Sequence, residues 1–318
     1  MKKFYTLLLS FLLMSCSHSE FNDDIKMVCP TGAPSLAFYS QATNTNFETN
    51  GTPKNIIAMM NDSSDKDIVV IDAISGINAI NKGVKYKLAS ILTFGNFYLV
   101  GTGNDDNNHL DSTDKIVLFG KDQTPDKLFH YIYGNLFDKS IEYVDGVADA
   151  GATLIGGKNP YTGSEIRYVF IAEPVYSNVA NNPNAKTYGK TSIYANIQEL
   201  FKEKSGNKEL IQAGLFVKDK DDKEYNQKIK NHLLALEESI NDAIANPSIV
   251  NDKLSNISED KVKALFGINS NIISKVLENN SVGLGYKKAI KIKDSIDNFI
   301  ELFDSTGIGS TDEKIYFK

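Results

Sequence analysis

The stretch that decides the fold runs from Asp67 to Thr102 and reads DIVVIDAISGINAINKGVKYKLASILTFGNFYLVGT. It opens with the apolar run Ile68-Val69-Val70-Ile71, whose β-branched residues favour a strand buried on both faces of a parallel sheet. A polar turn and a short helical pattern that stops at Gly83 follow this run. The stretch therefore predicts a strand–turn–helix unit of an α/β protein, with two further strands at 87–93 and 96–102.

The turn after the first strand is a candidate binding element. In an open α/β sheet, ligands bind beyond the carboxyl ends of the strands, and Asp72, Ile74 and Ser75 occupy that position. The free backbone N–H groups of a helix start favour hydrogen-bond-accepting groups. An ordinary turn, in which Asp72 or Ser75 only caps the helix, is the alternative interpretation.

A second unit of the same kind precedes this stretch. A short strand at 25–29 is followed by Thr31-Gly32-Ala33-Pro34-Ser35 and a helix that we expect to reach Asn44. Pro34 suits a first helical turn, and Gly32 lets the backbone come close to a ligand. We expect residues 44–51 to form a polar loop, followed by a helix at 54–61.

The chain then crosses into another α/β region and returns. The polar segment 103–114 breaks the pattern, strands are expected at 115–119, 141–144 and 167–172, and 211–217 is the expected return strand. We also expect a helix over 127–137, a possible strand at 186–188 and a helix within 193–204. The mainly helical end completes a first lobe of residues 25–102 plus 212–318, and residues 103–211 form a second lobe.

The first sixteen residues, MKKFYTLLLSFLLMSC, have the form of an export signal. Their apolar core is too short to span a bilayer comfortably, and Leu13-Met14-Ser15-Cys16 resembles the lipobox of bacterial lipoproteins. That resemblance implies a signal peptide at 1–15, lipid on Cys16 and a disordered tether at 16–24. A plain secretory signal is the alternative. Because Cys29 is the only other cysteine, an acylated Cys16 leaves no intramolecular disulfide.

Composition excludes several classes of function. With 42% hydrophobic and 23% charged residues, the 318-residue chain is globular, and its formal charge of −6 argues against nucleic-acid binding. Loss of Lys2 and Lys3 with the signal would make the charge more negative still. None of the four histidines has metal-ligand spacing, and no nucleophile motif is present, so we expect no cofactor and no enzyme activity.

The ordered motifs together resemble those of the type II periplasmic-binding fold, as found in the substrate-binding lipoproteins of ABC importers. Within that fold, the chain most resembles the group of binding proteins for nitrate, sulfonate, taurine and thiamine precursors. The resemblance spans nearly the whole mature chain and is carried by 31–35, 67–76, Thr93–Val100, Gln123-Thr124-Pro125-Asp126, Phe170–Pro174 and Gln212–Val217.

The resemblance implies an exported, lipid-anchored monomer that captures a small organic solute between two lobes and delivers it to a permease and its ATPase. Expected ligand contacts from the first lobe are Thr31, Gly32, Ala33, Ser35, Asp72, Ile74, Ser75 and Asn96. Those expected from the second lobe are Gln123, Thr124, Pro125 and Glu173.

Each contact has a simpler alternative. In that alternative the hydroxyl residues serve only as helix caps and Glu173 fixes a turn. The aromatic residues nearby (Phe38, Tyr39, Phe94, Phe97 and Tyr176) suit the core better than ligand stacking. Arg167 is the only arginine, so a bidentate anion clamp is unavailable unless it reaches the cleft. With Asp72 and Glu173 nearby, we therefore expect a nitrogen-containing organic ligand more than an anion.

Two other functions remain open from the sequence. A surface lipoprotein could use the same fold for adhesion or sensing. A pyrimidine-synthase-like enzyme is the other alternative, although such an enzyme relies on a metal and histidines that are not clustered here.

Overall fold

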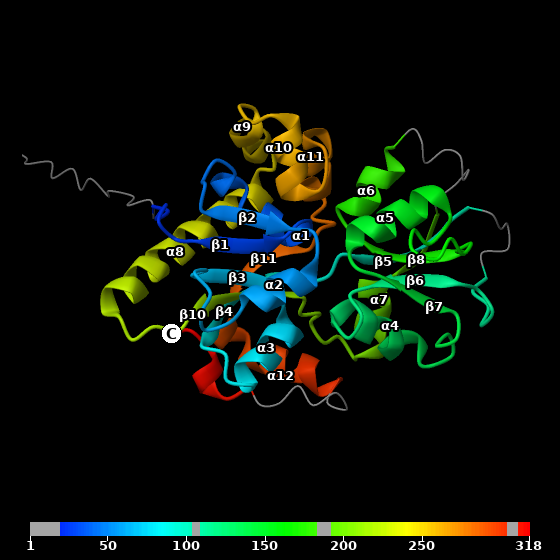
Figure 1. Ribbon diagram of the computed structural model, residues 1–318, viewed down its shortest axis with the longest axis horizontal. Coiled ribbons are helices and arrows are strands. Elements are labelled where there is room, and N and C mark those ends of the chain that lie inside the picture. The colour runs from blue at the N-terminus through cyan, green and yellow to red at the C-terminus, as the bar shows by residue number, and fades with distance from the viewer. Residues whose placement is uncertain (1–19, 104–108, 183–191, 304–310) are drawn as a thin grey trace, which may run out of the picture.

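The computed structural model describes residues 20–103, 109–182, 192–303 and 311–318. The described chain forms two β-sheets, each flanked by helices, and the two bodies lie side by side (Figure 1). The expected two-lobed α/β architecture with a helical C-terminal part is therefore confirmed. The predicted signal peptide, Cys16 and the possible strand at 186–188 lie outside the described residues.

The first sheet has six strands in the order β11-β4-β10-β3-β1-β2. Its strands are β1 (Met27–Pro30), β2 (Phe47–Asn50), β3 (Ile68–Asp72), β4 (Tyr86–Thr93), β10 (Ala213–Lys218) and β11 (Leu284–Lys288). β1 is parallel to β2 and β3, whereas β10 is antiparallel to β3 and β4. The sheet is therefore mixed, not purely parallel as the apolar run suggested.

The second sheet has five strands in the order β7-β6-β8-β5-β9. Its strands are β5 (Phe97–Gly101), β6 (Ile116–Phe119), β7 (Ile141–Val144), β8 (Tyr168–Ala172) and β9 (Ser192–Asn196). β6 is parallel to β7 and β8, and β5 is antiparallel to β8 and β9.

The helices divide between the two sheets. The first lobe holds α1 (Ala33–Leu36), α2 (Pro53–Met59), α3 (Ala73–Asn81), α8 (Lys223–Ala245), α9 (Ser248–Leu254), α10 (Glu259–Phe266), α11 (Ser270–Glu278) and α12 (Lys293–Glu301). The second lobe holds α4 (Thr124–Tyr133), α5 (Val147–Gly156), α6 (Val175–Ala180) and α7 (Ile197–Lys204). Short 3-10 helices complete the first lobe at Tyr39–Gln41, Ala289–Ile292 and Glu313–Ile315.

Strand β3 shows why this sequence makes a buried strand. Val69 and Ile71 belong to one apolar cluster of the core, and Ile68 and Val70 belong to the other, so successive side chains face opposite sides of the sheet. All four are at most 1% exposed. The prediction of a strand buried on both faces is confirmed.

The first crossing between the lobes lies at Phe94-Gly95-Asn96, earlier than the sequence suggested. β5 pairs with β8 from Phe97 to Gly101, so this strand belongs to the second sheet and its assignment to the first lobe was wrong. Gly95 adopts a φ of +109°, a conformation that turns the chain out of β4 and that favours glycine. The return crossing precedes β10, as expected.

Other differences are local. Residues 47–50 form edge strand β2 instead of a loop, and α4 begins at Thr124. The helix expected within 193–204 is present as α7, and β9 precedes it. The helix expected over 36–44 is shorter, because α1 ends at Leu36 and only a 3-10 turn follows. The end of the expected tether is docked, since the Phe21 ring packs edge-on against His232 of α8 at 5.1 Å between centroids.

Candidate functional site

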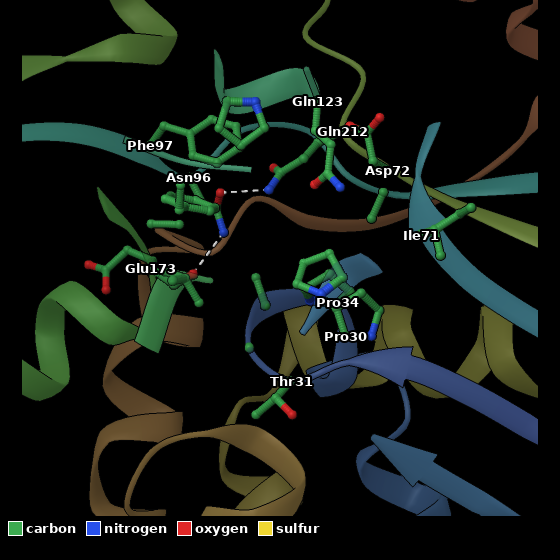
Figure 2. A pocket seen from close by; sticks show the side chains of 18 of the residues that line it. Pro30, Thr31, Pro34, Ile71, Asp72, Asn96, Phe97, Gln123, Glu173 and Gln212 are labelled. Carbon is green, nitrogen blue, oxygen red and sulfur yellow. Dashed lines mark hydrogen bonds between the residues drawn. The ribbon is translucent and has the colours of Figure 1, made fainter. Parts of the chain in front are cut away.

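A cleft of about 100 Å³ lies between the two sheets, where the carboxyl ends of β1, β3, β6 and β8 face one another. This volume exceeds the roughly 10–15 Å³ that one water needs and suits a small molecule. Figure 2 shows the side chains that surround it. The lining residues are Pro30, Thr31, Gly32, Ala33, Pro34, Gly51, Pro53, Ile71, Asp72, Asn96, Phe97, Phe119, Gln123, Pro125, Val147, Ala172, Glu173, Gln212 and Ala213.

Eight of the twelve predicted contacts line this cleft, from both lobes: Thr31, Gly32, Ala33, Asp72, Asn96, Gln123, Pro125 and Glu173. Ser35, Ile74, Ser75 and Thr124 are not among its lining residues. Ile74 is a core residue that is 3% exposed. Ser35 and Ser75 make local hydrogen bonds, and Thr124 is fully buried.

The loop after β1 brings backbone to the cleft. Gly32 has a φ of +124°, and no atom lies within 4 Å of where its Cβ would be. The Ser35 hydroxyl donates to the Gly32 carbonyl at 2.7 Å and accepts from the Gly32 N–H at 3.2 Å. Ser35 therefore fixes this turn from behind, as the capping alternative proposed.

Asp72 connects the two lobes. Its Oδ1 accepts hydrogen bonds from the Ser75 N–H and the Ser75 hydroxyl, both at 2.8 Å, which caps α3. Its Oδ2 accepts from the Thr124 N–H at 3.1 Å, at the first turn of α4 in the other lobe. The carboxylate therefore compensates the positive ends of two helices at once.

The start of α4 supplies Gln123 and Pro125 to the cleft wall. Thr124 between them is fully buried, and its hydroxyl has no hydrogen-bond partner among the described residues. Asp126 is held away from the cleft, since its Oδ1 accepts from the Tyr143 hydroxyl at 2.7 Å and its Oδ2 accepts from the Asp122 N–H at 2.8 Å.

A chain of amide hydrogen bonds joins both crossings (Figure 2). Gln212 Nε2 donates to Asn96 Oδ1 at 2.9 Å, and Asn96 Nδ2 donates to the Glu173 carbonyl at 2.8 Å. Asn96 is 1% exposed. The Gln212 backbone is fixed as well, because its carbonyl accepts from the Ala73 N–H at 2.8 Å.

The Glu173 carboxylate mainly serves its own helix. It accepts from the Ser177 hydroxyl at 2.8 Å and from the Ser177 N–H at 3.0 Å, in the first turn of α6. Burial raises the pKa of Glu173, while the Ser177 hydrogen bonds act in the opposite direction. The turn-fixing alternative thus describes this side chain well, although Glu173 also borders the cleft.

The described lining carries negative charge without a compensating cation. Asp72 and Glu173 are its charged side chains, and no Lys, Arg or His belongs to it. Arg167 pairs with Asp114 instead, with Nε 3.1 Å from Oδ1, beyond the opposite end of β8 from the cleft. An arginine clamp for an anionic ligand is therefore absent from the described lining.

The aromatic residues divide as their packing dictates. Phe97 and Phe119 border the cleft with rings 6.2 Å apart. Phe38 stacks on Phe47 in the core, and Tyr176 packs against Tyr98. The core position preferred for Phe97 is observed, since it is fully buried in the core, and this residue also borders the cleft.

Sequence reasoning missed several lining residues. Gly51 and Pro53 follow β2, which has one buried residue in four and gives almost no strand signal. Gln212 lies at a crossing, and its partner Asn96 is 116 positions away. The only feature of the sequence that could have indicated a role for Gln212 in the cleft is its place beside the return crossing.

The described residues contain no group of three or more His, Cys, Asp or Glu side chains that could hold a metal ion. Nor does any helix in the described part of the chain have the length and apolar character needed to span a membrane.

Comparison with known proteins gives a consistent fold. No protein-family model and no curated protein sequence matches the chain. Among solved structures, an ABC transporter protein from Parabacteroides distasonis matches with a TM-score of 0.65 and 20% identity, covering 92% of this chain and 99% of its own. The periplasmic aliphatic sulphonate binding protein SsuA from Escherichia coli matches with a TM-score of 0.59 and 12% identity, covering 90% and 94%.

An enzyme also shares this architecture. The desulfurization enzyme DSZB matches with a TM-score of 0.51 and 7% identity over 89% of this chain and 92% of its own. The fold alone therefore does not separate binding from catalysis. At these identities the comparisons establish architecture, and the chain has the two-lobed fold of periplasmic binding proteins.

Proposed function

We propose that this protein is the solute-binding component of an ABC import system and captures a small organic solute between its lobes. The cleft carries this proposal, because it is lined from both lobes at strand ends, where ligands of open α/β sheets bind. Solved structures of the same fold include proteins of this class.

The contacts across the cleft suggest how binding would work. Asp72 accepts a hydrogen bond from Thr124 of the other lobe. The lobes also approach closely at Gly146, where an added Cβ would lie only 2.7 Å from the Gly51 carbonyl oxygen of the first lobe. A ligand that touches both lobes favours the closed arrangement by its differential affinity for that state. The permease and ATPase would then respond to the closed form.

We further propose export and lipid anchoring through Cys16, on the outer face of the bacterial cell membrane, or on the periplasmic side if an outer membrane is present. The support is the sequence of the first sixteen residues. Changing Cys16 to Ala should release the protein from membranes, as measured by fractionation. Continued membrane retention of the Cys16→Ala protein would show that this lipid is not the anchor.

Native mass spectrometry tests the central proposal. Protein purified gently from cells should carry one small molecule per chain, and that molecule should also raise the melting temperature of ligand-free protein. A solute-free protein that responds to no vitamin, pyrimidine, amino acid or sulfonate would favour the adhesion or sensing alternative.

An enzyme remains the second alternative because of the similarity to DSZB. It predicts chemical turnover of the bound solute. Recovery of the same molecule, unchanged after prolonged incubation with the protein, would speak for binding and against catalysis.

A further inference from the structure

The amide chain in the cleft has a fixed direction. The Glu173 carbonyl can only accept, so Asn96 must turn its Nδ2 toward it, at 2.8 Å. Asn96 Oδ1 then faces Gln212, which must present Nε2, at 2.9 Å. Flipping either amide would set two donors or two acceptors against each other, so the backbone determines the orientation of both side chains.

This direction leaves one acceptor unused. Gln212 Oε1 is buried and has no hydrogen-bond partner among the described residues, and Gln212 lines the cleft. A buried acceptor without a partner is unfavourable, because its lost hydration is not replaced by another hydrogen bond. The side chain cannot rotate to satisfy this oxygen without breaking the bond to Asn96. A donor that enters the cleft would remove the cost.

The charges around this oxygen restrict the donor further. The described lining contains Asp72 and Glu173 and no basic residue. Asp72 Oδ2 already occupies the Thr124 N–H at 3.1 Å, a helix-terminal donor that would otherwise suit an anion. Phe97 and Phe119 add apolar surface.

We infer that Gln212 Oε1 is the specificity-determining acceptor of the cleft, and that it selects a ligand with an N–H donor and a neutral or positive charge. The inference rests on the proposed solute-binding function and names the ligand class. It separates this chain from binding proteins of the same fold that take sulfonates, such as SsuA.

The test uses three planar probes of nearly equal shape: benzamidine as a cation with N–H donors, benzamide as a neutral donor, and benzoate as an anion. Binding is measured by calorimetry on the full chain after removal of any bound solute. Benzamidine should bind more tightly than benzamide, and benzoate should bind at least tenfold more weakly than benzamidine.

A matched pair of variants identifies the acceptor. Gln212→Met keeps the side-chain length and removes both polar atoms, so benzamidine loses the Oε1 acceptor and Asn96 loses its Nε2 donor. Benzamidine binding should therefore weaken at least tenfold, the loss expected for one hydrogen bond. Gln198→Met is the control, since Gln198 also borders the first crossing, with Oε1 accepting from the Phe97 N–H, but does not line the cleft. This control should bind benzamidine like the wild type.

Several results would overturn the inference: tightest binding by benzoate, no benzamidine binding at millimolar concentration, or equal effects of the two variants. Circular dichroism melting must show that Gln212→Met is folded. If it is not, a crystal structure of the wild type with benzamidine decides, because an amidine nitrogen should lie within hydrogen-bond distance of Gln212 Oε1. Detection of an anionic solute bound in the cleft would refute this ligand class while leaving the proposed function intact.

Discussion

Replacing Asp72 with Ser should shift the ligand-free protein toward an open arrangement. Ser retains a side-chain oxygen that caps α3, in place of the 2.8 Å bond to the Ser75 N–H, but it is too short to reach Thr124. The variant therefore removes the bond between the lobes while it preserves the cap.

The size of the effect follows from the bond that is lost. Hydrogen bonds to charged groups contribute about 1.5–3 kcal/mol. The Asp72–Thr124 distance of 3.1 Å and the partial exposure of Asp72 place this bond at or below the lower end. A loss of about 1–2 kcal/mol changes the ratio of closed to open molecules by roughly 5- to 30-fold.

Small-angle X-ray scattering measures this shift directly as an increase in the radius of gyration. Solute affinity should fall as well, because a smaller fraction of molecules has the closed, binding-competent form. Asp222→Ser is the matched control, because Asp222 caps α8 by accepting from the Tyr225 N–H at 3.0 Å and does not line the cleft. Identical scattering from the two variants would refute the role of Asp72 in holding the lobes together.

Three further predictions concern stability and reactivity. Gly283→Ala should destabilise the protein by more than the about 1–2 kcal/mol expected from its left-handed backbone alone, because its Cβ would lie 2.2 Å from the Gly95 carbonyl oxygen at the crossing. Gly163→Ala, with a φ of +72° and open space around its Cβ, should show only the backbone cost in chemical denaturation. Burial lowers the pKa of His232 to about 4, so the unfolded state binds more protons than the folded state between about pH 6.5 and 4. The free energy of unfolding should therefore fall by on the order of 3 kcal/mol as the pH is lowered through that range. A His232→Phe variant that keeps the full decline would contradict this assignment. Burial also raises the pKa of the Cys29 thiol, so Cys29 should resist iodoacetamide in the native protein and react once the protein is denatured. Peptide mass spectrometry measures this labelling. Fast labelling of the native protein would contradict the prediction and mean that β1 opens readily.

Local patterns in the sequence predicted the elements whose burial they encode. The Ile68–Ile71 run has one face in each apolar cluster, and a short apolar run of β-branched residues is typical of a strand that is buried on both faces. The polar turns at strand ends were also identified, and eight of their residues line the cleft, because chain geometry places every such turn at the same edge of its sheet.

Pairing between distant segments could not be predicted in the same way. The sequence of β5 is compatible with either sheet, and only its partner β8, more than 60 positions later, decides that it belongs to the second. β2 has a single apolar residue, Phe47, that is buried, so its pattern does not differ from that of a loop. The Gln212–Asn96 bond likewise depends on two crossings meeting in space, which no local pattern records.

The most direct measurement is a crystal structure of the protein with the solute identified by native mass spectrometry. We expect one molecule between the two sheets, in contact with the loop after β1 and with Gln212, and with an N–H group directed at Gln212 Oε1. A solute bound on the outer surface of one lobe, with the cleft unchanged, would contradict capture between the lobes.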